Sequence, residues 1–236
     1  MTLYSQYLSV LREEAAQVVE ECGWTKDAVD RLEKLDSFIR ETQRISPLAS
    51  GKDSATPNVY PVLTSRTLVS TQRLAVEDFT FSNGVRIPKG TVIQGVATPV
   101  HSDPTIYDDP NDFKPFRFFS DDPDVPKKDM ATISLEYLPF SYGRNAWCVM
   151  SLPIAPIDRL LILLLSNSPG RWYAQTIIKL GLAHLLLYYD FEMEKKYEGR
   201  HPPDIPFQAA NVPYPWAKMR FRARRSGNSI WRQNFA

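Results

Sequence analysis

Apolar residues recur with a helical period through the first part of the chain. Between residues 3 and 22 they fall at every third or fourth position, which predicts an amphipathic helix. Gly23 is expected to end this helix, and Thr25 to cap the N-terminus of the next one. The same period continues from Leu32 and stops before Pro47, so the sequence predicts two helices in this region.

The pattern then changes from helical to extended. Residues 51–68 show neither a helical nor a strand period. From Val69 onward polar and apolar residues alternate, and the turn Ser82-Asn83-Gly84 lies between two such runs, which predicts a β-hairpin. Residues 102–130 are rich in Asp and Pro and are expected to form an ordered loop region.

The last third of the chain opens with a strongly apolar segment. Residues 171–189 are apolar nearly all round a helix, a pattern typical of a helix buried inside a larger protein. The tail from Ser226 is polar and is expected to fray. The longest aliphatic run, residues 160–165, is far too short to cross a bilayer, and the charged opening segment is no signal peptide. No membrane anchor is predicted.

Composition narrows the range of functions. Hydrophobic residues make up 43% of the 236-residue chain, which is enough for a sizeable core. The 28 basic and 27 acidic residues leave a net charge of +1, which argues against nucleic acid as a partner. The two cysteines, Cys22 and Cys148, are typical of free thiols in a reducing compartment.

Two short motifs carry charges at suggestive spacings. Glu41 and Arg44 lie three residues apart and therefore on one helix face, although such a pair alone is usually a weak, solvated ion pair. Arg117 lies in the run Phe-Lys-Pro-Phe-Arg-Phe at 113–118, and its guanidinium could fork onto the Glu41 carboxylate. By itself, Arg117 would be interpreted as a surface arginine between aromatic residues.

A third motif is divided into two parts. Residues 140–146 read Phe-Ser-Tyr-Gly-Arg-Asn-Ala, and residues 169–174 read Pro-Gly-Arg-Trp-Tyr-Ala. Joined through a single cysteine, the two halves would form one continuous loop running into a helix. Residues 147–168 stand in the place of that cysteine.

Taken in order, these three motifs resemble the three signatures of the cytochrome P450 family. The segments between them are similar as well, including the hairpin Phe-Thr-Phe-Ser-Asn-Gly-Val-Arg-Ile-Pro-Lys-Gly-Thr at 79–91. Fungal members that oxidise terpenoids and other secondary metabolites have a segment similar to residues 24–44, which read Trp-Thr-Lys-Asp-Ala-Val-Asp-Arg-Leu-Glu-Lys-Leu-Asp-Ser-Phe-Ile-Arg-Glu-Thr-Gln-Arg. The chain is identified as a member of this family, matching its C-terminal part only.

The resemblance implies an α+β, mainly helical fold: the C-terminal part of the cytochrome P450 fold, with small β hairpins and a heme-loop/helix segment. It predicts a single partial domain over residues 1–236. Five stretches follow one another in it: helices ending in the Glu-x-x-Arg motif (1–50), an insertion (51–68), the hairpin, the Phe-x-Pro-x-Arg-Phe loop and the first half of the heme loop (69–146), a second insertion (147–168), and a buried helix with C-terminal strands and tail (169–236).

Functional residues carry over from the family position by position, and none of them is a catalytic side chain. Glu41, Arg44 and Arg117 would form a buried ion-pair triad behind the heme. Arg73 and His101 match positions that contact or lie near the heme propionates. The heme loop would contribute Phe140, Gly143 and Arg144. Asn145 departs from the family pattern, which puts one propionate contact in doubt.

The iron ligand is the least settled position. A thiolate ligand donates electron density to iron and favours O–O cleavage, and loop N–H groups and a helix N-terminus stabilise the thiolate. In the family this cysteine comes seven residues after the phenylalanine, whereas Cys148 comes eight after Phe140 and precedes Val149-Met150. Cys148 is therefore either a metal ligand to iron or an ordinary thiol, with comparable support.

A genetic interpretation accounts for the divided loop. A cysteine codon split by an intron, when read through, gives Trp at position 147 and Ser at 168, the residues present. The dipeptide Gly51-Lys52 can likewise encode a splice donor. On this hypothesis 147–168 and 51–68 are translated introns.

The expected function is that of a heme-thiolate monooxygenase hydroxylating a small apolar molecule, here truncated, with the activity of this chain left open. Intact relatives use O₂ and electrons from NADPH-cytochrome P450 reductase at the endoplasmic reticulum membrane; without an anchor, this chain would be cytoplasmic. One alternative is a pseudogene product or mis-spliced remnant that binds no heme. A third, an unrelated small binding module, predicts a stable fold without cofactor.

Overall fold

The computed structural model describes residues 6–46, 69–142 and 169–194, and, beyond these, 197, 202, 205–207, 210–212, 214 and 216–224. Its helices are α1 (Leu8–Cys22), α2 (Lys26–Arg31), α3 (Glu33–Ile45), α4 (Thr98–His101) and α6 (Pro169–Tyr188). Its strands are β1 (Val69–Leu74), β2 (Phe79–Thr80), β3 (Arg86–Ile87), β4 (Val92–Val96), β5 (Tyr189–Met193), β6 (Ile205–Phe207), β7 (Ala210–Val212) and β8 (Met219–Ala223). Helices dominate and the strands form small antiparallel pairs, which confirms the predicted fold class.

The first predicted helix is confirmed, together with its boundary. Helix α1 ends at Gly23, whose φ of 63° is a backbone conformation that residues with a Cβ rarely adopt. The hydroxyl of Thr25 then accepts a hydrogen bond from the Ala28 N–H and so caps α2. The turn between α1 and α2 therefore follows directly from two adjacent sequence signals.

The second predicted helix is wrong as a single element, because it is broken into α2 and α3. Leu32 leaves the helical conformation, with a ψ of 72°. The Glu14 carboxylate of α1 accepts hydrogen bonds from the N–H groups of Lys34 (2.6 Å) and Leu35 (2.9 Å). These N–H groups belong to the first turn of α3 and have no partner within it. A side chain from a neighbouring helix thus stabilises a new helix start that local periodicity does not predict.

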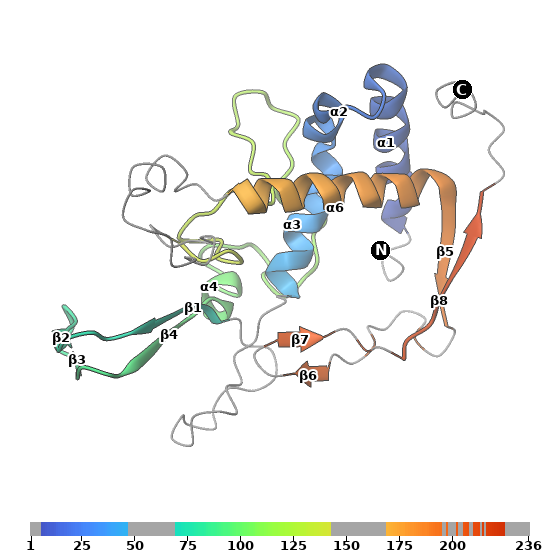
Figure 1. The fold of residues 1–236 in the computed structure, drawn as a ribbon. Coiled ribbons are helices and arrows are strands. Elements are labelled where there is room, and N and C mark those ends of the chain that lie inside the picture. Colours follow the sequence, from blue (N-terminus) through green and yellow to red (C-terminus); the bar gives the residue numbers. More distant parts are fainter. Residues whose placement is uncertain are drawn as a thin grey trace, which may run out of the picture.

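The hairpin predicted around Asn83-Gly84 is confirmed. Strands β2 and β3 pair antiparallel, with Phe79 opposite Ile87. Gly84 takes a φ of 87° in the turn. Strands β1 and β4 form a second antiparallel pair in the same arm, which extends away from α1, α2, α3 and α6 (Figure 1).

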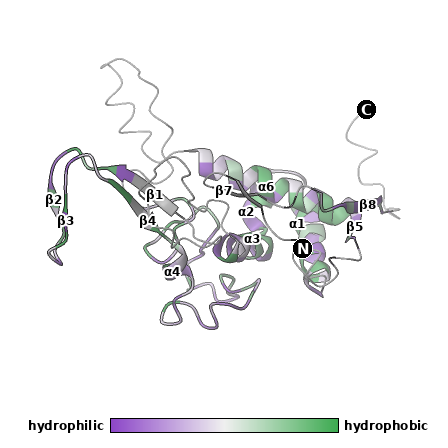
Figure 2. Cartoon of the chain, turned by 90° about the horizontal axis from the view of Figure 1, so that it is seen from below, coloured by the Kyte–Doolittle hydropathy of each residue, from purple (hydrophilic) through white to green (hydrophobic). Residues whose placement is uncertain are grey.

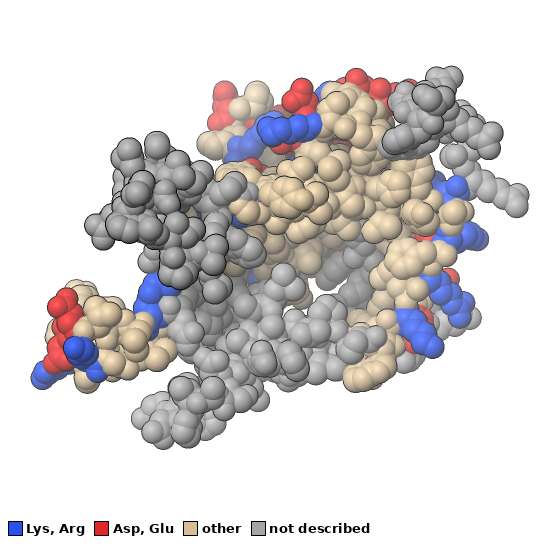
Figure 3. All heavy atoms as spheres, viewed as in Figure 1, with Lys and Arg blue, Asp and Glu red and all other residues tan. Residues whose placement is uncertain are grey.

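Helix α6 lies across α1, α2 and α3 and contacts all three (Figure 1). Its Ala183 and Leu186 are fully buried against them. The helix is covered only in part, and four of its large residues are exposed: Trp172, Tyr173, Ile177 and Ile178. The described helices cover only one face of an element that is apolar nearly all round. Figure 2 shows the apolar character along α6, and in Figure 3 its outer surface is largely uncharged.

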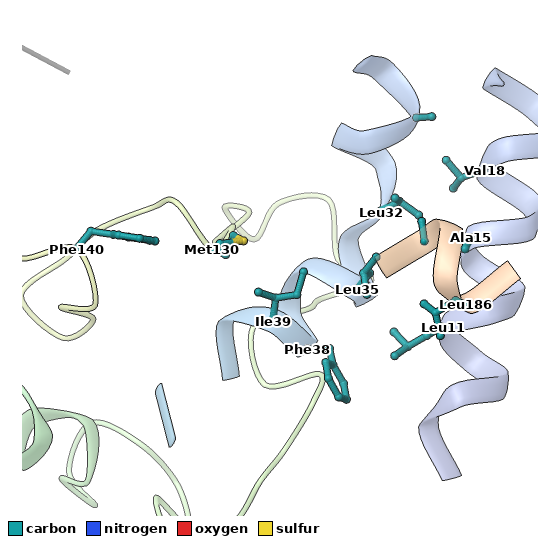
Figure 4. Packing of buried hydrophobic residues seen from close by; sticks show 12 residues of the cluster. Leu11, Ala15, Val18, Leu32, Leu35, Phe38, Ile39, Met130, Phe140 and Leu186 are labelled. Atoms are coloured by element: carbon teal, nitrogen blue, oxygen red, sulfur yellow. The ribbon is translucent and has the colours of Figure 1, made fainter. Parts of the chain in front are cut away.

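One hydrophobic cluster joins the helices to the loop region. Leu11 of α1, Leu35 of α3 and Leu186 of α6 are each 0% exposed and lie close together (Figure 4). Met130, from the loop before the divided motif, and Phe140, the first residue of that motif, extend the cluster to one side (Figure 4). The core therefore ties that loop to α3.

Arg12 links the first described helix to the end of α6. Its guanidinium donates hydrogen bonds to the carbonyl oxygens of Leu186 (3.0 Å) and Tyr189 (3.1 Å), and to the Asp190 carboxylate (3.1 Å). Carbonyl groups in the last turn of a helix have no partner within that helix, so a cation here supplies the missing donors. Strand β5 then leaves α6 at once and pairs with β8.

Within the part of the chain that the structure describes, no helix combines the length and the hydropathy that a bilayer crossing requires.

Candidate functional site

Glu41 and Arg44 form a fully desolvated ion pair on α3. Arg44 Nε and Nη2 donate to the two carboxylate oxygens of Glu41, each at 2.8 Å, in a fork geometry. The side chains are only 1% and 0% exposed. The remaining Arg44 nitrogen, Nη1, donates to the carbonyl oxygens of His101 (2.6 Å) and Pro110 (2.7 Å). Every group of the pair thus has partners, as buried charges require.

Arg117 completes the group from a distant loop. Its Nε lies 3.1 Å and 3.2 Å from the Glu41 oxygens. The other guanidinium nitrogens donate to the carbonyl oxygens of Asp108 and Asp112 in the same loop. The Lys114 N–H adds a further hydrogen bond to Glu41 at 3.0 Å. The structure therefore brings the three predicted residues Glu41, Arg44 and Arg117 together and fixes residues 108–117 on α3.

Asp36 is a second buried carboxylate on the same helix. Its Oδ1 lies 3.2 Å from Lys179 Nζ and accepts a hydrogen bond from Gln175 Nε2 at 2.9 Å, so it connects α3 to α6. Its Oδ2 accepts the Met130 N–H at 2.7 Å. Burial raises the pKa of Asp36, while the Lys179 charge opposes that shift.

Arg40, also on α3, is another buried charged residue. Its guanidinium lies over the rings of Phe118 (4.6 Å) and Tyr137 (3.7 Å), and it donates to the carbonyl oxygens of Asp129 and Thr132. The Tyr137 hydroxyl in turn donates to Gln43 Oε1 at 2.7 Å. The segment 118–137 is thereby held to α3 through aromatic and polar contacts.

His101, at the end of α4, is 1% exposed and stacks on the Tyr137 ring at 5.7 Å. Its Nε2 accepts the Leu138 N–H at 3.0 Å. Burial, together with the nearby Arg44 charge, lowers the pKa of His101 to about 4. The ring is therefore neutral at physiological pH.

The remaining predicted residues divide into two groups. Arg73 is exposed on β1, and Phe140 is buried at the start of the divided loop. Gly143, Arg144 and Cys148 lie outside the described residues, as do both proposed insertions. The described residues contain no cluster of three or more His, Cys, Asp or Glu side chains that could hold a metal ion.

Comparison with known proteins identifies the family. A model of the cytochrome P450 family matches residues 63–149. Cytochrome P450 monooxygenase 151 of Postia placenta is 32% identical over 94% of the chain, and cytochrome P450 monooxygenase CYP512U6 of Ganoderma lucidum is 31% identical over 94%. The chain belongs to the cytochrome P450 family. It spans 37% and 36% of the length of these two relatives.

Further relatives and a solved structure agree with this assignment. Cytochrome P450 monooxygenase paxQ of Penicillium paxilli is 32% identical over 94% of this P450 chain. The retinoic acid-bound cyanobacterial CYP120A1 superposes with a TM-score of 0.58 over 94% of the chain and 41% of that protein, at 18% identity. This structural likeness shows that the fold is that of a cytochrome P450.

Several residues of this P450 site were missed by sequence reasoning. Asp36 and Arg40 lie four positions apart on α3, and Arg44 lies four further on, so a charged row runs along the helix beside its apolar stripe. That spacing is a usable signal for a buried polar face. Tyr137 and Lys179 carry no comparable signal, because their partners lie far away in the sequence.

Proposed function

We propose that this chain forms the C-terminal, cofactor-supporting part of a heme-thiolate monooxygenase that hydroxylates a small apolar molecule in fungal secondary metabolism. The observation that carries the proposal is the Glu41–Arg44–Arg117 group, in which Glu41 and Arg44 are fully buried and the Arg117 side chain is 10% exposed. Charges held away from water are costly to keep unless they are paired. Here they hold α3, the loop 108–117 and, through the Arg44 bond to the His101 carbonyl, the segment that leads to the divided motif.

The described residues fit a flat, largely apolar cofactor carrying carboxylates. The exposed side of α6 offers Trp172, Tyr173 and Ile177 as apolar surface, and Arg73 offers an exposed guanidinium suited to a propionate. In this proposal Arg73 binds heme, Phe140 packs at the base of the heme loop, and Cys148 supplies the thiolate. Heme bound by a thiolate supplies the O₂-activating chemistry; Glu41, Arg44 and Arg117 keep the supporting helix and loop in place.

The proposal extends to the partners that such chemistry needs. The whole protein would take electrons from NADPH-cytochrome P450 reductase at the endoplasmic reticulum membrane. Substrate, reductase and membrane are inferred from the family, since the chain spans 37% of the relative in Postia placenta.

The test is hemin titration of the purified chain, followed by reduction and exposure to carbon monoxide. We expect hemin uptake and a thiolate-type Soret band in the wild-type chain. Cys148→Ser should abolish that band and leave protein folding unchanged. Cys22→Ser is the matched control, because Cys22 is the other cysteine of the chain. Cys22 lies at the end of α1, and its Sγ accepts a hydrogen bond from Arg31 of α2 at 2.8 Å. This variant should keep the band.

Two other outcomes have distinct meanings. Hemin uptake with the same spectrum in both cysteine variants would show that Cys148 is not the ligand. A chain that takes up no hemin would instead be the non-enzymatic remnant. The divided loop at 140–174 favours this second candidate function, because the two halves match a continuous family loop.

The insertion hypothesis has its own measurement. Sequencing spliced transcripts should recover forms lacking residues 51–68 and 147–168, with a cysteine codon restored at the second junction. The end of the family match at residue 149, just inside the second segment, supports this reading. Absence of splice borders in the genomic DNA would contradict it. A chain lacking both segments should then bind hemin more tightly than the present one.

A further inference from the structure

The short turn that precedes the divided loop is held on both sides of one residue. The Leu138 carbonyl accepts a hydrogen bond from the Ser141 N–H at 3.1 Å, which closes the turn. The Leu138 N–H donates a hydrogen bond to His101 Nε2 at 3.0 Å. Ser141 has a φ of 66°, a left-handed conformation that a residue with a Cβ rarely adopts. A turn with such a backbone persists only where its surroundings fix it.

His101 is well placed to provide that support. Its own carbonyl oxygen accepts from Arg44 Nη1 at 2.6 Å, so its backbone is tied to the buried charge group of α3. Its ring stacks on Tyr137 with an interplanar angle of 24°, and Tyr137 is itself held by the Arg40 guanidinium. Contacts other than the one with Leu138 therefore determine both the position and the orientation of the imidazole.

The hydrogen bond also determines the protonation of the ring. Because Nε2 accepts the Leu138 N–H, the single hydrogen of the neutral imidazole resides on Nδ1. Nδ1 is buried and has no hydrogen-bond partner in the described structure. The charged groups facing the ring are Arg44 and Arg40 of α3; with burial, they lower the pKa of His101 to about 4. Nε2 is thus available as an acceptor throughout the physiological pH range.

We infer that His101 is a positioning residue for the heme loop. Its Nε2 fixes the turn at Leu138–Ser141, and its carbonyl oxygen is held by Arg44, so the position of the turn depends on the position of Arg44. The link between this turn and a heme loop rests on the proposed function. The role differs from the position near the heme propionates predicted for His101 by resemblance, because the partner here is a backbone N–H of the protein. That earlier role stays a prediction.

Two substitutions separate the two nitrogens. Gln places an acceptor near the position of Nε2, whereas Asn places its polar group near that of Nδ1. The first measurement is hydrogen exchange of the Leu138 amide in the purified chain without cofactor. We expect His101→Gln to keep the protection of this amide and His101→Asn to speed its exchange about tenfold, as loss of one buried hydrogen bond predicts. The amide of Gly90, bonded to Ala75 in the distant hairpin, is the internal control.

A measurement on the unsubstituted chain tests the inference even where the variants fail to fold. The ¹⁵N NMR signals of the His101 ring should show hydrogen on Nδ1 and a bare Nε2. A hydrogen on Nε2 would overturn the inference, whatever the variants do. So would equal Leu138 exchange in the wild type, His101→Gln and His101→Asn.

The hemin spectrum then links the turn to the site. In a chain that takes up hemin, His101→Gln should keep the thiolate-type band and His101→Asn should weaken it. The reverse order would assign the function to Nδ1 and reject the positioning role. If the wild-type chain takes up no hemin, the proposed function fails, while the exchange and NMR results still decide the contact between His101 and Leu138.

Discussion

Helix α3 carries two buried carboxylates that are held in different ways. Glu41 faces two guanidinium groups, those of Arg44 and Arg117, in addition to a backbone N–H. Asp36 faces one ammonium, that of Lys179, one amide and one N–H. The two sites lie little more than one helical turn apart, and both are nearly without exposure to solvent.

The contrast shows how the type of cation sets the role of a buried pair. A guanidinium stays charged under all conditions and binds carboxylate through two parallel hydrogen bonds, so the Glu41 site has one stable arrangement. A lysine ammonium is a point charge without the guanidinium fork, and burial raises the pKa of Asp36, which favours its neutral form. The Glu41 site is therefore the rigid one, and the Asp36 site has a neutral alternative.

The largest expected effect is at Glu41. Glu41→Gln leaves the buried Arg44 and the nearly buried Arg117 charged and without a compensating carboxylate. We expect the free energy of unfolding to fall by about 3–5 kcal/mol, measured by urea denaturation. Glu20→Gln, at an exposed position on α1, is the control and should change little. A loss at Glu41 no larger than that at Glu20 would mean that the group is far better hydrated than its geometry indicates.

The next effect is a pH dependence of the free energy of unfolding, and it comes from His101, whose carbonyl oxygen is bonded to Arg44 of the Glu41 site. His101 has a folded-state pKa of about 4 against an ordinary 6.5. As pH falls below 6.5, the unfolded chain binds the proton first, so stability is lost on acidification. The loss is about 1.4 kcal/mol per pH unit, or about 3 kcal/mol in total by pH 4.

The measurement is urea denaturation of wild type and His101→Gln across this range. The Glu14 and Asp36 carboxyls, whose pKa values are raised, contribute in the opposite direction but are present in both proteins. The difference between the two curves therefore isolates His101. Parallel curves would show that this ring does not change its protonation on unfolding.

At Asp36 we expect a smaller effect. Asp36→Asn keeps an acceptor for Gln175 or Met130 and leaves one cation, Lys179, without its carboxylate, whereas Glu41→Gln leaves two. The expected loss in free energy of unfolding is about 2 kcal/mol. Combining it with Lys179→Met should cost less than the sum of the two single changes, because the pair is coupled. Strict additivity would indicate that the two charges do not interact in solution.

The smallest effect is expected at the hairpin. Asp78 and Arg86 are ion-paired at 2.6 Å but remain 51% and 72% exposed. Water and salt screen such a pair. Asp78→Asn should leave the urea midpoint unchanged, and it is the surface control for both buried sites. A clear shift would mean that the hairpin packs on another part of the protein.

Much of this fold was readable from local sequence signals. Gly23, Thr25 and the Asn83-Gly84 turn each act on neighbouring residues, so their structural effects could be predicted. The triad at Glu41 was accessible because the motifs resemble those of a family, since spacing alone suggested only a weak surface pair. The break at Leu32 was not accessible: it depends on Glu14, which lies on another helix. Likewise, Gln175 meets Asp36 across 139 positions, and nothing local to either residue marks that contact.

The bonds from Arg12 have a consequence for how the chain is made. Its partners Leu186 and Tyr189 lie 174 and 177 positions later. At ordinary rates of translation, roughly 10–35 seconds pass between synthesis of the arginine and synthesis of these carbonyl groups. During that interval the Leu11 side of α1 has emerged while the helix that covers it has not been made. Until then α1 can pack only on α2 and α3, and a ribosome that stalls before residue 186 releases a chain in which the α6 side of Leu11 stays uncovered.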